Sequence, residues 1–405
     1  MIKNAMKILT ICILMFIALI VCFFPYDIYN KFTDNMVITS EEINLLNSQP
    51  YAKFITTDFD DSVVYANEND QNLKMLNLKL FNLITINKYL VNLVDTDVIA
   101  CGNSIGMILK SKGVIIVGFN SVLTSDGNKK PCETSPLMIG DRIVEIENKE
   151  INTSEDIDAV LTEEGYDGRA LSIIAYRGNE KIECEINPVK DYISSKYKVG
   201  LWVREDASGV GTLTYIRKDT NRFGALGHPI SEESCNEPLQ ISGGEIYNCD
   251  VVGINKGTKG KTGDIRGLFV AGQNSQGVID KNIDYGVFGN INDTSELLNA
   301  STYDIGGRLS VKPGKAQILA CINGRSVEKF DIEIIKTNFQ KYSNNKSMVL
   351  RVTDKKLLEK TGGIIQGMSG SPIIQNGKIV GAVTHVFVSD PSKGFGIYLD
   401  WMIDN

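Results

Sequence analysis

The sequence predicts a mainly β protein with a membrane anchor at its N-terminus. Between residues 200 and 403, brief apolar runs such as VVGI, YGVFG and AQILACI alternate with Gly and Asn-Gly turns. Short strands at this spacing are typical of a barrel or sandwich. Only Thr353 to Lys360 has a helical pattern there. Near the N-terminus, Ile8 to Tyr26 contains no charged residue and is about as long as a bilayer core is thick.

The apolar run is predicted to be an uncleaved transmembrane anchor within residues 1–26. Lys3 and Lys7 precede it and Asp27 follows it, so the basic flank stays in the cytoplasm and the remainder is exported. A cleaved signal peptide is the competing interpretation. The run is long for such a signal and no A-x-A site follows it. Both interpretations place the remainder outside the cytoplasm.

The composition excludes several classes of function. The chain has 405 residues, 43% of them hydrophobic, which is enough for two or three domains with hydrophobic cores. Its net charge is −7. No cluster of Lys and Arg is present, which argues against nucleic-acid binding. Only His228 and His385 could supply imidazole ligands, and no C-x-x-C pair occurs. We therefore expect no metal and no cofactor.

A small β-rich unit is predicted after a juxtamembrane stalk at 27–97, a segment that mixes polar and apolar residues and is expected to contain some helix and strand. Its order is a run of β-branched strands, a Gly140-Asp141 turn, a strand at 142–147, and a helix that Thr153 or Ser154 caps. The strand order, the G-D-x-I pattern and the capped helix resemble a PDZ domain over residues 98–190. The alternative is that these glycines are only turn residues in a sheet.

The resemblance to PDZ domains implies a peptide-binding site. In that family an extended peptide adds to a sheet edge, and a backbone loop holds its terminal carboxylate. In this chain that loop would be GNSIGM, whose residues are Gly102, Asn103, Ser104, Ile105, Gly106 and Met107. The loop departs from the usual GLGF form, so an internal peptide is an alternative ligand.

The segment GMSGSP contains a candidate nucleophile, Ser369. Glycines on both sides let the backbone expose the side chain and turn the N–H groups of Gly367 and Ser369 toward one point, as an oxyanion hole requires. A strand, an Asn-Gly hairpin and a returning strand follow, so the segment resembles the nucleophile region of chymotrypsin-type serine proteases. The alternatives are a serine in a tight turn, and Ser371 as the nucleophile, although its place before Pro372 suits a strand start.

The candidate base is one of two histidines. His228 lies in FGALGHPI, a turn between apolar residues, whereas His385 lies on the returning strand that lines the cleft in chymotrypsin-type enzymes. We therefore predict His228 as the base and assign His385 to the cleft wall or to packing. Spacing does not select the acid of a triad. The candidates are Asp264, Asp280, Asp284, Asp304 and Asp354.

The motifs FGALGHPI, RVTDKKLL and GGIIQGMSGSPIIQNGKIVGAVTHVFVSDP together resemble the stage IV sporulation protein B family, serine peptidases of endospore formers. The resemblance implies a triad of His228, Asp354 and Ser369, and a chymotrypsin-like double β-barrel at 191–405. Without it, Asp354 would be interpreted as a helix cap.

The resemblance also implies a role in signalling. Members are exported across the forespore inner membrane, into the space between the forespore and mother-cell membranes. They cleave their own N-terminal region and then a membrane-bound regulator, which leads to activation of a late mother-cell sigma factor. Two alternatives remain: a non-catalytic PDZ scaffold with a protease-like fold, and a quality-control protease of the HtrA type, in which the protease precedes the PDZ unit.

Overall fold

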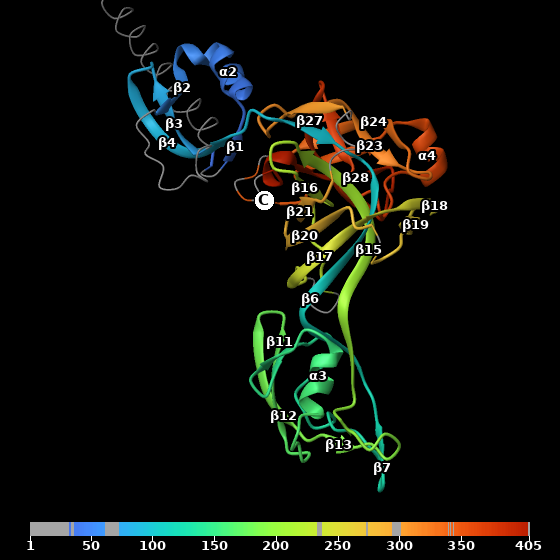
Figure 1. Cartoon of the computed structure of the whole chain (residues 1–405). Coiled ribbons are helices and arrows are strands. Elements are labelled where there is room, and N and C mark those ends of the chain that lie inside the picture. The colour runs from blue at the N-terminus through green and yellow to red at the C-terminus, as the bar shows by residue number, and fades with distance from the viewer. Residues whose placement is uncertain are drawn as a thin grey trace, which may run out of the picture.

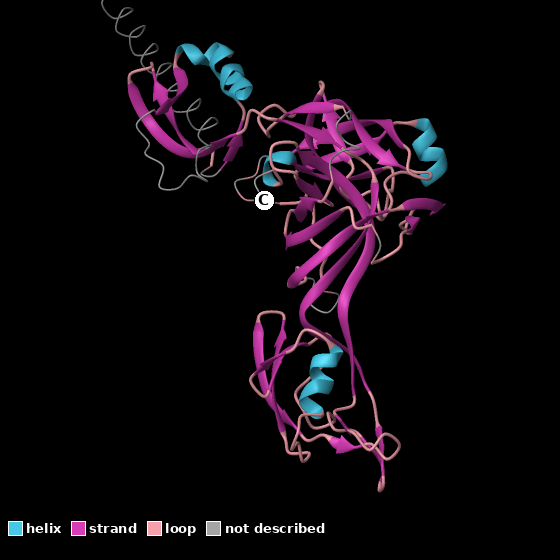
Figure 2. Ribbon diagram, viewed as in Figure 1, coloured by secondary structure: helices cyan, strands magenta, loops and turns pink. Residues whose placement is uncertain are grey.

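The computed structural model describes residues 32–33, 36–60, 73–232, 237–272, 274–293, 301–338, 340, 342 and 344–403. Figures 1 and 2 show that strands dominate and that helices are few and short. The predicted mainly β fold is confirmed. Within the described ranges, no helix is long and apolar enough to cross a membrane. The predicted anchor at Ile8 to Tyr26 lies outside those ranges.

A first ring of antiparallel strands closes around one apolar core. Its strands, in ring order, are β6 (Ser104–Phe119), β15 (Leu201–Arg217), β16 (Arg222–Ala225), β21 (Gly286–Ile291), β20 (Gly277–Ile283) and β17 (Ile241–Asn248), which pairs again with β6. Buried Ile, Leu, Val and Phe side chains on the inner faces fill this ring, as alternation along each strand requires.

A second ring follows along the chain and closes in the same way. Its strands, in ring order, are β23 (Gly314–Cys321), β24 (Val327–Thr337), β25 (Met348–Val352), β28 (Lys393–Tyr398), β27 (Lys378–Val386) and β26 (Pro372–Gln375), which pairs again with β23. A separate apolar core lies inside it. Two such rings fit the predicted double β-barrel.

Shorter elements join and flank the rings. β5 (Asp97–Ala100) pairs with β15, and β22 (Thr302–Ile305) pairs with both β5 and β27, so one sheet passes from ring to ring. The others are the hairpin of β18 (Asp250–Asn255) and β19 (Asp264–Leu268), the helix α4 (Lys355–Thr361) and the 3-10 turn η4 (Leu399–Trp401).

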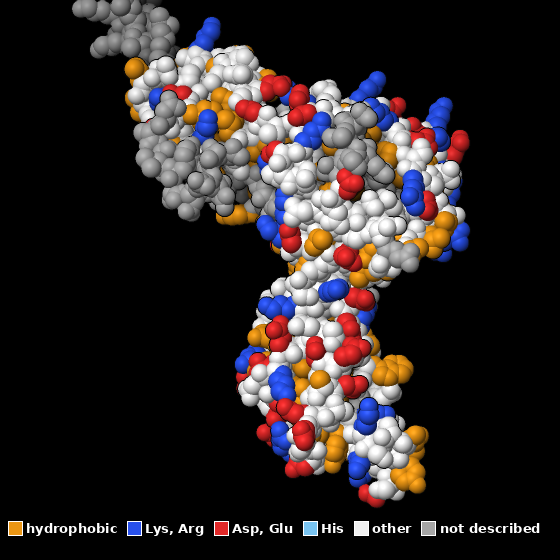
Figure 3. All heavy atoms as spheres, viewed as in Figure 1, with side chains coloured by type: hydrophobic (Ala, Val, Ile, Leu, Met, Phe, Trp, Pro, Cys, Tyr) orange, Lys and Arg blue, Asp and Glu red, His pale blue; other side chains and the backbone are white. Residues whose placement is uncertain are grey.

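A third unit is inserted between β6 and β15. It contains β9 (Arg142–Ile146), α3 (Ser154–Leu161), β11 (Leu171–Arg177), β12 (Glu180–Ile186) and the short pairs β7 (Val122–Thr124) with β8 (Gly127–Lys129), β10 (Lys149–Glu150) with β9, and β13 (Val189–Lys190) with β14 (Tyr197–Lys198). Thr153 caps α3 in a capping box with Asp156, at one of the two predicted positions. Figure 3 shows a narrow waist between this unit and the rings.

The predicted boundary at residue 98 does not match the strand pairing. The first half of β6, up to Ser111, pairs with β15 and β17 in the first ring, and only its second half pairs with β9 of the inserted unit. One continuous strand therefore serves two cores. Alternation along a strand reports only its two faces, so the sequence pattern carries no mark at the crossing.

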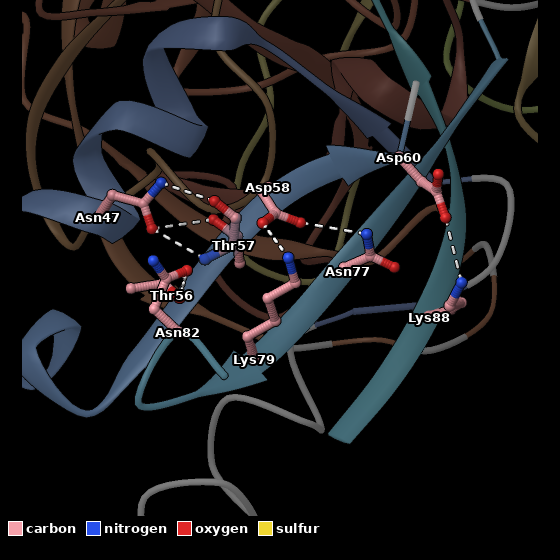
Figure 4. Close-up of polar contacts among 9 residues, drawn as sticks. All are labelled: Asn47, Thr56, Thr57, Asp58, Asp60, Asn77, Lys79, Asn82 and Lys88. Carbon is pink, nitrogen blue, oxygen red and sulfur yellow. Dashed lines mark hydrogen bonds and ion pairs between the residues drawn. The ribbon is translucent and has the colours of Figure 1, made fainter. Parts of the chain in front are cut away.

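Residues 36–60 and 73–93, within the predicted juxtamembrane stalk, form a compact unit with its own core. It contains β1 (Met36–Ile38), α2 (Ser40–Ser48), η1 (Pro50–Lys53), β2 (Ile55–Asp60), β3 (Leu73–Leu80) and β4 (Ile84–Leu93). The sheet has the order β1-β4-β3-β2 and packs its own core against α2. Figure 4 shows polar contacts that join α2 and the strands: Asn47 bonds the backbone of Thr57, and Asp58 bonds Asn77 and Lys79.

The N-terminal unit is docked on the second ring through a buried charge cluster. Glu42 of α2 accepts a hydrogen bond from the amide of Ser310 at 3.0 Å. Arg308, in the same turn, forms an ion pair with Asp400 in which both side chains are at most 1% exposed. Burial, and secondly the nearby Asp400, raise the pKa of Glu42 to about 7. The cluster fixes the unit beside the C-terminal turn η4.

Candidate active site

Ser369 lies in a tight loop immediately before β26. Gly367 and Gly370, on either side, have φ of +94° and +95°, which favour glycine. The amides of Met368 and Gly370 donate to the carbonyls of Ile365 and Val383. Among the described residues, by contrast, the amides of Gly367 and Ser369 donate to no backbone carbonyl. These two amides are the predicted oxyanion donors, and the structure leaves them available.

A cavity of about 360 Å³ opens beside Ser369 at the junction of the two rings. Its polar groups include His228, Ser369 and His385, while Ile364, Ile365 and other aliphatic side chains form most of the wall. His228 follows β16 of the first ring, and Ser369 and His385 belong to the second. The structure thus brings together the predicted nucleophile, the predicted base and the predicted wall histidine.

The His228 ring is held in the tautomer that a general base needs. Its Nδ1 lies 2.8 Å from the carbonyl oxygen of Pro229. A carbonyl only accepts, so the neutral ring carries its proton on Nδ1 and leaves a lone pair on Nε2. Burial lowers the pKa of His228. The side chain is therefore neutral at neutral pH and able to accept a proton.

His385 packs beside His228, with ring centroids 5.0 Å apart. Burial, and secondly the charges of His228 and Lys346, lower the pKa of His385 to about 4. Within the described part of the chain, its buried Nδ1 has no hydrogen-bond partner. A neutral, tightly held imidazole in this place fits the wall role that the sequence predicted.

Ser369 is in a resting arrangement. Its Oγ donates to the carbonyl oxygen of Thr384 on β27 at 2.7 Å. Attack on a substrate requires the hydroxyl to turn from this carbonyl toward His228, because a peptide carbonyl accepts a hydrogen bond but is too weak a base to remove the proton. Hydrogen bonds of this kind often align only when substrate is bound.

The structure does not bring Asp354 into this cavity. Its carboxylate accepts a hydrogen bond from the amide of Leu357 at 2.9 Å and caps the N-terminus of α4. It is absent from the residues that line the cavity. The Pro229 carbonyl contacts Nδ1 of His228, where a triad would place the acid. The alternative interpretation of Asp354 as a helix cap matches this geometry.

Two substitutions separate capping by Asp354 from a role in catalysis. We expect Asp354→Ala to lower the free energy of unfolding by about 1 kcal/mol, and Asp354→Asn to change it by a few tenths, because Asn caps helices as well as Asp does. Urea unfolding of both variants measures this. A large loss of activity in the Asn variant at unchanged stability would show that the carboxylate also acts in catalysis.

The predicted peptide-binding loop, Gly102 to Met107, lies elsewhere than expected. Its residues join β5 to β6 in the first ring, pair with β15 and β17, and are buried except for Asn103. Met107 even lines the cavity beside Ser369. The prediction placed this loop in the PDZ-like unit, whereas its strand pairing places it in the first ring.

The inserted unit has a different groove that the sequence interpretation missed. A cavity of about 300 Å³ is lined by α3, by residues 120–123 and by the start of β15. Gly200, with φ +68°, packs so closely on the carbonyl of Asn120 that a Cβ would lie 2.5 Å from it. The sequence feature that could have indicated this groove is VGLW at 199–202, in which a glycine between apolar residues opens a strand.

Residues 195–403 match the family model described as SpoIVB peptidase S55, which covers just over half of the chain. No curated protein matches the sequence. Nine chains of solved structures match. One, described as the crystal structure of the Rv3671c protease in an inactive form, is 12% identical, covers 47% of this chain and 78% of its own, and has a TM-score of 0.26.

Proposed function

Since this chain belongs to the SpoIVB peptidase S55 family, a family of serine peptidases, we propose that it is an endopeptidase in which Ser369 is the nucleophile and His228 the base. The observation that carries the assignment is the shared cavity, in which both residues meet beside two free amides. Neither a metal nor a cofactor takes part in the proposed reaction.

The proposed reaction proceeds through an acyl-enzyme. Ser369 Oγ attacks the peptide carbonyl carbon and gives its proton to Nε2 of His228, while the amides of Gly367 and Ser369 bind the oxyanion. The imidazolium then protonates the leaving amine as the C–N bond breaks. Water repeats the sequence, releases the acid and restores Ser369. The Nδ1 contact with Pro229 keeps the ring oriented through both steps.

A serine-directed reagent tests this proposal. We expect diisopropyl fluorophosphate to label the full chain once, on the tryptic peptide that contains Ser369, because an activated serine reacts far faster than an ordinary one. Mass spectrometry locates the label, and Ser369→Ala is the control. No label, or a label on Ser371, would contradict the proposal.

The pH profile follows from the environment of His228. Burial lowers its pKa below 6.5, and only the neutral ring acts as a base. We therefore expect kcat/KM to be highest above neutral pH and to fall on the acid side with a midpoint below 6.5. Cleavage of a fluorogenic peptide between pH 4 and 8 measures it. A midpoint above 6.5 would show that another group, or an anionic partner of His228, sets the profile.

The groove of the inserted unit is proposed as the peptide-binding site of a PDZ-like domain. At its start, β15 pairs with β6 on one side, and α3 and β15 together wall the groove, which is the arrangement for adding a peptide strand. Trp202, 61% exposed, lies at its edge. We expect a peptide with an apolar C-terminus to bind in this groove, and we expect Trp202→Ala to weaken the binding. Calorimetry measures the affinity of wild type and variant, with the free-acid peptide compared with its C-terminal amide.

The biological role is proposed from the family. The protein would be anchored in the forespore inner membrane, with its catalytic part in the space between the forespore and mother-cell membranes. It would cleave its own N-terminal region and then a membrane-bound sporulation regulator, which leads to activation of a late mother-cell sigma factor. Expression of Tyr26 onward, as wild type and Ser369→Ala, tests self-cleavage. N-terminal fragments that appear only in the wild type support it; equal patterns favour the scaffold alternative.

A further inference from the structure

Thr212 contacts the nucleophile loop from the opposite ring. It lies in β15 and is 1% exposed. Its Oγ1 donates to the carbonyl of Gly367 at 2.7 Å, and its backbone N–H donates to the carbonyl of Ser369 at 3.0 Å. One residue of the first ring thus supplies two donors to the loop of the second.

These two bonds complete the anchoring of two peptide groups. The Gly367–Met368 group is bonded at both ends, through Thr212 Oγ1 and through the Met368 amide to Ile365. The Ser369–Gly370 group is bonded at both ends as well, through the Thr212 N–H and through the Gly370 amide to Val383. Between them lies the Met368–Ser369 group, whose N–H is a proposed oxyanion donor. Its orientation follows from its two fixed neighbours.

The two rings are in close backbone contact at this point. A Cβ on Gly370 would lie 2.1 Å from the carbonyl oxygen of Thr212. That same oxygen accepts a hydrogen bond from the amide of Leu226, two residues before His228. The backbone of Thr212 therefore contacts the strand that leads to the base as well as the loop that carries the nucleophile.

We propose that Thr212 is a positioning residue that aligns the oxyanion donors with the nucleophile, and that its hydroxyl is the group on which this alignment depends. This inference rests on the proposed peptidase function. Removal of Oγ1 releases one end of the Gly367–Met368 group, and a displacement of about 1 Å at a catalytic group lowers rates by about 100-fold. Substrate binding in the ground state does not use the oxyanion donors fully, so KM is expected to change less than kcat.

The test uses the full chain in detergent and a fluorogenic peptide that the wild type cleaves. We expect Thr212→Val, which removes the hydroxyl and keeps the shape, to lower kcat by about 10- to 100-fold with KM changed by less than about threefold. Thr212→Ser restores the hydroxyl and is expected to recover kcat to within about threefold. A peptidyl boronic acid forms a tetrahedral adduct, so its affinity is expected to fall in parallel with kcat/KM.

Thr214 supplies a matched control on the same strand. It is fully buried, and its Oγ1 has no partner among the described residues. We expect Thr214→Val to leave kcat and boronate affinity unchanged. Equal losses in both Val variants, an unchanged kcat in Thr212→Val, or no recovery in Thr212→Ser would overturn the inference.

The test still decides the question if Thr212→Val does not fold, or if the wild type shows no peptidase activity. If Thr212→Val does not fold, kcat of Thr212→Ser compared with Thr212→Ala decides the question, because only the former keeps the hydroxyl. If the wild type neither cleaves nor takes the organophosphate label on Ser369, the proposed function itself fails and this inference fails with it. Labelling of Ser369 in the wild type, without a kcat loss in Thr212→Val, overturns the positioning role alone.

Discussion

Replacement of Ser369 by Ala is expected to lower kcat for peptide cleavage by at least about 10⁴-fold. The hydroxyl is the atom that forms the acyl-enzyme, and no other described side chain in the cavity can replace it as a nucleophile in that position. Cleavage of a fluorogenic peptide by equal amounts of folded wild type and variant measures the loss. The oxyanion donors remain in the variant, so any residual rate reports their contribution.

Ser371 is the matched control for this substitution. It lies two residues away, is fully buried, and its Oγ has no partner among the described residues. Its backbone amide and carbonyl bond Met368 and Val383, and a substitution by Ala leaves both in place. We expect Ser371→Ala to keep kcat within about twofold. A loss in Ser371→Ala with activity kept in Ser369→Ala would exchange their roles.

The local chemistry of the site was predictable from the sequence because it depends on neighbouring residues. The glycines that turn the Ser369 loop, the hairpin after it and the turn around His228 are each encoded within a few positions. Their pairing in one site was predicted from the choice between only two histidines and from the resemblance to chymotrypsin-type enzymes. The contact of His228 with Pro229 is also local, but a backbone carbonyl leaves no mark in a side-chain pattern.

Features that depend on long-range pairing were not predictable. Residues 102–111 belong to the first ring because β15 and β17 pair with them, more than 90 positions further along the chain. The hydrogen bond from the Thr212 hydroxyl to the Gly367 carbonyl joins residues 155 positions apart. The sequence shows the strand pattern of each partner, but nothing in it identifies which strands pair or that Thr212 faces the nucleophile loop.

The buried ion pair between Arg308 and Asp400 is expected to be the most sensitive point for stability. Arg308→Met leaves the Asp400 carboxylate without its cation in a site where the side chain is fully buried. Loss of one partner of such a pair costs about 3 to 5 kcal/mol. Urea unfolding at pH 7 measures the change in the free energy of unfolding. The exposed pair of Arg351 and Glu333 is the control, where Arg351→Met is expected to cost less than about 1 kcal/mol.

The loss of stability in Arg308→Met is expected to depend on pH and on whether Asp400 is still present. Burial already raises the pKa of Asp400, and without Arg308 its carboxyl will take up a proton more readily. The destabilisation in Arg308→Met is therefore expected to shrink as pH falls from 7 to 5, because the neutral acid costs less to bury. The double variant Arg308→Met/Asp400→Leu removes both charges and should recover most of the lost stability. A double variant as unstable as the single one would show that Arg308 stabilises the fold mainly through its stacking on Trp401 and its bond to the Gln340 carbonyl.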